Sequence, residues 1–305
     1  MVQPTPAGDI DSAVTETQRR DRLAGIGLMM ITLVLFTTLD TSAKWLGQAL
    51  PVLMIVSIRY LGHFLLAALV LNPWHHPQAW RTRRPGLQIL RGMLLCGSTA
   101  SNFLALQHMQ LAETMTVSFS APLIIAAAAG PMLGEWIGPR RWAAILVGFA
   151  GVLLVLRPGA GAFNPFMIAA FANAACYAGY ALLTRKLSGI DSPGSMLLIS
   201  AAVPSLVLAP LLPFVWQTPP TWLHWGLVLA TGLLGSSGHW FLIRAHERAP
   251  AAILAPWTYA QLLWMTLAGY LVFGDLPSAW TLAGAGIVVA SGLYLLYRER
   301  VVGKR

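Results

Sequence analysis

Ten apolar blocks, each of roughly 20 residues, dominate the chain and limit the folds open to it. A helix rises about 1.5 Å per residue, so a block of roughly 20 residues crosses the ~30 Å hydrocarbon core of a bilayer. The blocks cover residues 23–43, 51–71, 87–107, 112–133, 141–156, 163–184, 194–216, 222–243, 250–273 and 279–297. Only 10% of the residues are charged, whereas soluble domains carry about 25%. The pattern predicts an all-α membrane protein with ten transmembrane helices.

The basic residues predict how these helices are oriented. Cytoplasmic loops retain an excess of Lys and Arg during membrane insertion. If the ten spans alternate, one side receives seventeen of the twenty basic residues, namely Arg19, Arg20, Arg22, Arg81, Arg83, Arg84, Arg91, Arg140, Arg141, Arg185, Lys186, Arg244, Arg248, Arg298, Arg300, Lys304 and Arg305. The other side receives only Lys44 and Arg157, and Arg59 lies inside a span. We therefore expect a multi-pass membrane protein with both termini in the cytoplasm.

The net charge of +9 is also a feature of many nucleic-acid-binding proteins. Here the basic residues lie in short loops between apolar blocks, so membrane topology explains them and we expect no nucleic-acid partner. The sequence contains no phosphate-binding loop, zinc-ligand spacing or nucleophile elbow. We therefore expect no cofactor, no bound metal and no enzyme. The predicted partners are the lipid bilayer and a small-molecule substrate, and the predicted working unit is a monomer.

The two halves of the chain repeat weakly. Corresponding positions carry the pairs Pro51 and Pro193, Lys44-Trp45-Leu46 and Arg185-Lys186-Leu187, His108 and His246, Gly134-Glu135 and Gly274-Asp275, and Trp142 and Trp280. Five spans are an odd number, so the second unit enters the membrane inverted, as in many secondary transporters. The predicted organisation is a disordered cytoplasmic tail, two five-helix repeats and a short cytoplasmic tail, at residues 1–22, 23–157, 163–297 and 298–305.

The order of these features resembles the drug/metabolite transporter superfamily, and within it the EamA-type exporters with two five-helix repeats. The resemblance covers about 23–297. It rests on the Gly-acid pairs that end the fourth and ninth spans, on Pro122 and Pro256 within those spans, and on Arg59 in the second. Bacterial exporters of aromatic amino acids are the nearest likeness. The resemblance implies a secondary transporter of the bacterial inner membrane that exports neutral and aromatic amino acids, such as phenylalanine, tryptophan, threonine and methionine, by alternating access.

Charged groups inside the spans are costly in a bilayer, so they are candidate functional residues. Arg59 and His63 lie one helical turn apart on the second span, and Arg59 is a candidate for binding a substrate carboxylate. The alternative is a structural pair between Arg59 and Asp40 or helix carbonyls. Asp40 and Lys44 have the spacing of an ion pair on one helix face, and we expect them to pair. Asp40 is also the candidate for proton coupling.

Polar and aromatic groups in four other spans complete the predicted substrate site. Asn102 and Ser118 are the favoured residues of the third and fourth spans, and Asn173 and Tyr177 share a face of the sixth. The ninth span contributes Trp257, Tyr259 and Gln261. Aromatic walls with a few convergent polar groups suit a small organic ligand, although lipid-facing aromatics are an alternative. We expect Pro122 and Pro256 to kink their helices and free carbonyl groups for a cavity.

Two other functions compete with amino-acid export. An exporter of cationic drugs, or of other small metabolites, is the first, but a cation calls for a carboxylate in the cavity and the spans offer only Asp40. A membrane-embedded enzyme is the second. Such an enzyme requires polar catalytic loops, and the outer loops here are short, with Glu113, His224 and Asp275 as their main polar groups. Amino-acid export is therefore the favoured prediction.

Overall fold

The computed structural model describes residues 7–134, 136, 138–156 and 164–302. Its elements are α1 (Ala7–Leu46), α2 (Val52–Leu71), η1 (Pro77–Trp80), α3 (Pro85–His108), α4 (Leu111–Ser118), α5 (Ser120–Leu133), α6 (Pro139–Leu156), α7 (Met167–Leu187), α8 (Pro193–Leu208), η2 (Ala209–Leu211), α9 (Leu212–Val215), α10 (Trp222–Arg248), α11 (Ala251–Leu254), η3 (Ala255–Tyr259), α12 (Ala260–Ala268), η4 (Gly269–Phe273) and α13 (Ala279–Val302). The all-helical prediction is confirmed for these residues.

Nine helical segments of the described chain are long and apolar enough to cross a membrane. The remaining predicted span, at 250–273, is divided into α11, η3, α12 and η4, which follow one another directly. Nine long spans and one broken span account for the ten apolar blocks. α1 begins at Ala7, so residues 7–22 of the predicted disordered tail are helical. The predicted junction between the repeats, at 157–163, and Glu135 lie outside the described residues.

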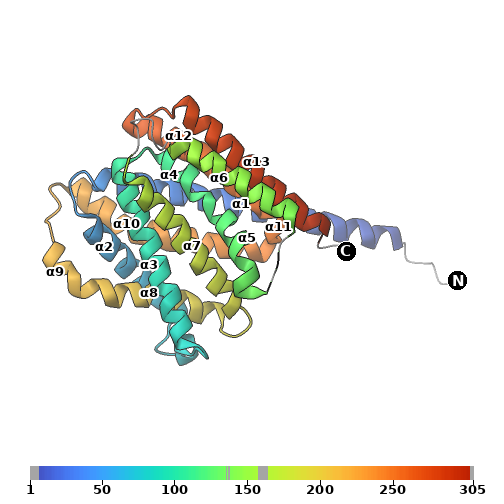
Figure 1. Ribbon diagram of the computed structural model, residues 1–305. Coiled ribbons are helices and arrows are strands. Elements are labelled where there is room, and N and C mark those ends of the chain that lie inside the picture. The colour runs from blue at the N-terminus through green and yellow to red at the C-terminus, as the bar shows by residue number, and fades with distance from the viewer. Residues whose placement is uncertain (1–6, 135, 137, 157–163, 303–305) are drawn as a thin grey trace.

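The packing of the helices has a two-fold internal symmetry. α1 packs against α10 and α12, and its counterpart α7 packs against α3 and α5. α2 packs against α8, and α6 against α13 along one edge of the bundle (Figure 1). These contacts between the halves thus recur, or map onto themselves, when the roles of the halves are exchanged. This pattern fits the two inverted repeats predicted from the sequence.

We name the two ends of the bundle by the chain termini. The start of α1 and the end of α13 lie on the same side in Figure 1, and we call this side the terminal face. The opposite side, where α1 ends at Leu46 and α13 begins at Ala279, is the far face. The fourth and ninth spans end in Gly134 and Gly274, with φ of 76° and 71°. This left-handed conformation is one that glycine adopts without steric cost, and it stops both helices in the same way.

The fourth and ninth spans are both interrupted. Between α4 and α5 the helix breaks at Phe119, three residues before Pro122. In the ninth span η3 replaces the α-helix from Ala255, and Pro256 lies in its first turn. Proline has no N–H group and its ring clashes with the preceding turn, so an α-helix is hard to continue through it. Both interruptions lie at or close to the prolines at which kinks are predicted, and they lie in corresponding spans of the two halves.

Asp191, between α7 and α8, joins the halves at the terminal face. Its carboxylate accepts hydrogen bonds from Thr82 Oγ1 at 2.6 Å, Arg83 N at 2.9 Å and Gln88 Nε2 at 2.7 Å. Burial raises the pKa of Asp191, but these hydrogen bonds and the charge of Arg83 outweigh it and hold the pKa below its ordinary value of 3.8. The carboxylate is therefore ionised at neutral pH.

We expect Asp191→Asn to destabilise the protein by about 1–3 kcal/mol, because the new NH₂ group meets donors where it needs acceptors. A lowered pKa in the folded state stabilises the fold above the ordinary pKa and loses this effect as pH falls through the folded value. The loss of unfolding free energy relative to wild type should therefore be constant from about pH 5 to 8 and become smaller in stronger acid. Thermal unfolding in detergent measures it, with the exposed Glu247→Gln as control. Equal stability of the two variants would contradict this role of Asp191.

Candidate functional site

A hydrogen-bonded polar network lies between the halves. Asn173 of α7 donates to Ser118 Oγ at 2.9 Å and Asn102 Oδ1 at 3.3 Å, and accepts from Ser98 Oγ at 2.6 Å. Asn102 in turn donates to Asp40 Oδ1 at 3.1 Å. These residues come from α1, α3, α4 and α7, so both halves contribute. The structure brings together four residues predicted from the sequence, namely Asp40, Asn102, Ser118 and Asn173.

Arg59 is a buried cation on α2. It is 6% exposed, donates to Thr99 Oγ1 at 3.1 Å, and its guanidinium carbon lies 4.9 Å from the ring centre of Tyr60. Among the described residues no carboxylate lies within 4.0 Å of its nitrogens, and Arg59 Nε has no hydrogen-bond partner. Asp40 attracts Arg59 through space without a direct ion pair, and a buried cation that no carboxylate contacts is costly. A substrate carboxylate would supply the missing partner.

An ion pair joins the two halves at the far face. Lys44 Nζ, at the end of α1, lies 2.7 Å from Asp275 Oδ2, after the ninth span. It also donates to the carbonyl of Met109 at 2.9 Å and lies 4.7 Å from the ring centre of Phe273. The predicted pairing of Lys44 with Asp40 is wrong. The i, i+4 spacing places them on one helix face, but Asp275 from the other half meets Lys44 directly while Asp40 binds Asn102.

The breaks in the fourth and ninth spans meet each other. Phe119, at the first break, contacts Tyr259, at the end of η3, with ring centres 4.9 Å apart and an edge-to-face angle of 62°. Phe119 directly follows Ser118 of the polar network. Discontinuous helices near the midplane form the substrate sites of several transporter folds, because irregular backbone is tolerated where it lines a cavity.

A cavity of about 320 Å³ leads from the terminal face toward this aromatic pair. Its walls come mainly from α5, η3 and α13, and Tyr259 lies in its lining together with Pro122 and Gly292. Arg141 and Arg185 also line it, at the terminal-face ends of α6 and α7. The cavity therefore opens on the side of the bundle opposite the Lys44–Asp275 ion pair.

Gly292 of α13 makes room for Tyr259, because a side chain at this position would overlap the tyrosine hydroxyl. We expect Gly292→Ala to displace the ring and to cost about 1–3 kcal/mol of stability by overpacking. Gly286→Ala on the same helix is the matched control, since no atom lies within 4 Å of its Cβ position. Alanine favours a helix over glycine, so this control should be as stable as wild type or more so. Thermal unfolding of both variants measures the effect, and a Gly292→Ala protein as stable as the control would contradict the packing.

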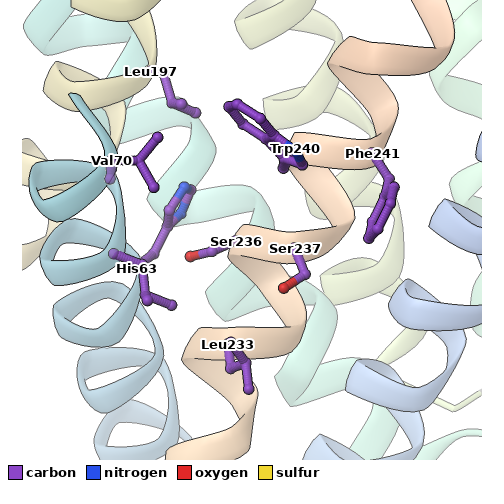
Figure 2. Close-up of a pocket in the computed structure, with 10 residues that line it drawn as sticks. His63, Val70, Leu197, Leu233, Ser236, Ser237, Trp240 and Phe241 are labelled. Carbon is purple, nitrogen blue, oxygen red and sulfur yellow. The ribbon is translucent and has the colours of Figure 1, made fainter.

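The other predicted site residues lie apart from the polar network. Tyr177 is 45% exposed, and its ring centre lies 6.0 Å from that of Tyr180. Trp257 of η3 is 43% exposed, and Gln261 lies half-buried at the start of α12. His63 is buried, stacks on His239 at 5.5 Å, and lines a separate pocket between α2 and α10 (Figure 2).

Sequence reasoning missed three parts of the site. The Lys44–Asp275 pair joins residues far apart in the chain, although the Gly274-Asp275 repeat marked one partner. Phe119 has no polar atom to single it out, and only its place before Pro122 signals the break. The partners of Arg59, Thr99 and Tyr60, share a hydrogen bond of 2.8 Å with each other. Their sequence offers no signal beyond hydroxyl groups within spans.

Comparison with known proteins identifies the class that this fold and site define. Residues 23–157 and 164–298 each match the EamA-like transporter family. The chain belongs to this family, in the drug/metabolite transporter superfamily, and is a multi-pass membrane transporter rather than an enzyme.

Its relatives have different cargoes. The chain is 31% identical over 281 residues to an S-adenosylmethionine uptake transporter of Rickettsia felis, covering 91% of this chain and 94% of the relative. It is 30% identical over 253 residues to a riboflavin transporter of Vibrio cholerae, covering 80% and 84%. A pseudopaline exporter of Pseudomonas aeruginosa is 26% identical, covering 89% and 95%. One solved structure shares the fold with a TM-score of 0.58 at 20% identity, covering 91% of this chain and 98% of the other.

Proposed function

We propose that this transporter carries a zwitterionic metabolite with an α-amino-acid group, and that neutral and aromatic amino acids are its first candidates. The observation that carries the proposal is Arg59, a buried cation with no carboxylate partner among the described residues. A substrate carboxylate pairs with its guanidinium, as Arg commonly binds carboxylates in buried sites. The substrate ammonium group binds on the side of Asp40, whose carboxylate Asn102 holds in place.

The same proposal assigns a direction to the bundle. The excess of Lys and Arg places the terminal face in the cytoplasm and the far face outside the inner membrane. The cavity lined by Tyr259 then opens inward, while Lys44 and Asp275 close the outside. Export requires the opposite arrangement in a second conformation, reached by a rocking of the two halves about the polar network. A single chain contains both halves, so a monomer suffices.

The relatives' names support a polar metabolite as cargo without fixing its identity. S-adenosylmethionine contains the amino-acid group of methionine, whereas riboflavin has no such group. Both names occur among relatives of similar identity to this chain. The charged side chains of Arg59 and Asp40 inside the spans favour a cargo that has an amino-acid group.

Equilibrium binding tests the class of cargo. Labelled methionine should bind the purified protein saturably, and phenylalanine, threonine and S-adenosylmethionine should compete with it. Methylamine, propionate and riboflavin each lack one or both of the charged groups and should compete weakly. Direct saturable binding of labelled riboflavin or of a labelled lipophilic cation, with no binding of methionine or another amino acid, would overturn the proposal.

A further inference from the structure

A second pocket lies between α2 and α10, with α8 contributing one wall. Its volume is about 210 Å³, which is below the ~300–1,000 Å³ of sites for drug-sized ligands. Figure 2 shows His63 projecting from α2 toward α10, with Ser236 opposite and Trp240 one turn further along α10. The remaining lining is mostly aliphatic, and no charged side chain contributes to it. The pocket therefore suits a small, neutral and largely apolar molecule.

The pocket exists because two glycines let α2 and α10 cross at close range. A Cβ placed on Gly62 would lie 3.0 Å from Gly232 Cα, and one placed on Gly232 would lie 2.8 Å from Gly62 Cα. Small residues allow this kind of backbone contact between membrane helices. His63 directly follows Gly62, and Ser236 lies one turn after Gly232. The floor of the pocket is thus held in place by the crossing.

The pocket opens toward the lipid-facing surface of the bundle. Val70 is 61% exposed, Leu233 55% and Trp240 41%. Apolar side chains exposed along a membrane span face the hydrocarbon of the bilayer. A ligand therefore reaches this pocket from within the membrane, and the pocket is separate from the cavity that ends at Tyr259.

Two polar atoms in the pocket have no partner. His63 Nδ1 and Ser236 Oγ are buried and make no hydrogen bond in the described structure. The His63 residue as a whole is only 3% exposed. Unpaired polar atoms in apolar surroundings are costly. A lipid acyl chain would fill the space but leave both atoms unpaired. A hydroxyl group can donate and accept, so it can satisfy both atoms in either tautomer of the imidazole.

We propose that this pocket binds a neutral, membrane-soluble, single-ring phenolic compound. The ring lies among the apolar side chains beside Trp240, and the hydroxyl group hydrogen-bonds to His63 Nδ1 and Ser236 Oγ. Offset or edge-to-face contact with the indole ring adds to the burial of the ligand. The lining of this site differs from that of the amino-acid site proposed above, because neither Arg59 nor any residue of the polar network around Asn173 lines the pocket.

The test compares p-cresol with p-xylene, in which a methyl group replaces the hydroxyl. Full-length protein in lipid nanodiscs is equilibrated with each labelled compound, and binding to empty nanodiscs is subtracted. We expect saturable binding of p-cresol, about 10- to 100-fold tighter than that of p-xylene, the ratio expected for two hydrogen bonds. Ser236→Ala and His63→Phe should each weaken p-cresol binding by about tenfold, the loss expected for one hydrogen bond.

Matched variants separate this effect from general damage. Ser205→Ala on α8 and His246→Phe on α10 make the same chemical changes at residues that do not line the pocket. Both side chains hydrogen-bond to their own helices. These controls should bind p-cresol like wild type. Size-exclusion chromatography checks that each variant is folded, and Ser236→Ala alone decides the outcome if His63→Phe is not. Equal binding of the two compounds, no binding above empty nanodiscs, or equal losses in the controls would overturn the proposal.

Discussion

Replacing Arg59 by glutamine should weaken substrate binding by about 10- to 100-fold. A hydrogen-bonded contact to a charged group contributes roughly 1.5–3 kcal/mol, which corresponds to this range of dissociation constants. Glutamine keeps a donor of similar position but removes the positive charge opposite the substrate carboxylate. Equilibrium binding of labelled methionine measures the loss.

The stability of the same variant distinguishes substrate binding from a structural role. Without substrate, Arg59 is a buried cation with no carboxylate partner in the described structure. Removing it should change the thermal stability little, because Asp40 attracts it only through space and a buried charge that no carboxylate contacts is unfavourable. Arg244→Gln is the control, since that side chain is 52% exposed on α10. A strong loss of stability in Arg59→Gln, with binding intact, would show that Arg59 is a structural residue.

Replacing Lys44 by methionine should open the far face. The substitution removes the ion pair with Asp275, the hydrogen bond to Met109 and the contact with the Phe273 ring. Lys44 and Asp275 are 12% and 27% exposed, so solvent weakens the pair only in part. We expect the loss to favour the outward-open state by about 1–2 kcal/mol, a roughly 5- to 30-fold change in the ratio of states.

Cysteine accessibility measures this opening. Ala112 lies buried at the start of α4 on the far face, and Ala112→Cys serves as reporter after Cys96 and Cys176 are replaced. A membrane-impermeant maleimide should label it faster from the far face in Lys44→Met and Asp275→Asn. Asp21→Asn is the control, because the Asp21–Arg248 ion pair also joins the halves but is about half exposed. Unchanged labelling in both far-face variants would mean that the pair does not hold this side closed.

The fold was largely predictable from the sequence, because in a membrane every span must be long, apolar and internally hydrogen-bonded. Gly134 and Gly274 indicated where the fourth and ninth spans end, and Pro122 and Pro256 indicated where the same two spans are interrupted. The contacts between spans were less predictable. Asp40 and Lys44 have ideal spacing for an ion pair on one helix, yet Lys44 pairs with Asp275, which lies 231 positions away in the sequence. Local periodicity contains no information on such partners.

The site was predictable where polarity inside a span was the signal. Asn102, Ser118 and Asn173 meet in one network because each is too polar to face lipid unpaired. Aromatic residues gave a weaker signal, since they are equally suited to cavities and to lipid. Tyr259 contacts the second break, whereas Trp257, two residues earlier, is 43% exposed. His63 lies one turn from Arg59 on α2 but lines the other pocket, which Arg59 does not line.

Counterflow tests most directly whether this transporter carries an amino acid through a site reached from each side in turn. Purified protein is placed in liposomes loaded with unlabelled phenylalanine, and labelled phenylalanine is added outside at low concentration. Carriers that alternate between two states exchange the internal for the external substrate, so the label should rise transiently above its equilibrium level and then fall. Arg59→Gln should largely abolish this rise. A label that only approaches equilibrium, or no uptake above empty liposomes for phenylalanine, methionine, threonine or S-adenosylmethionine, would contradict the account.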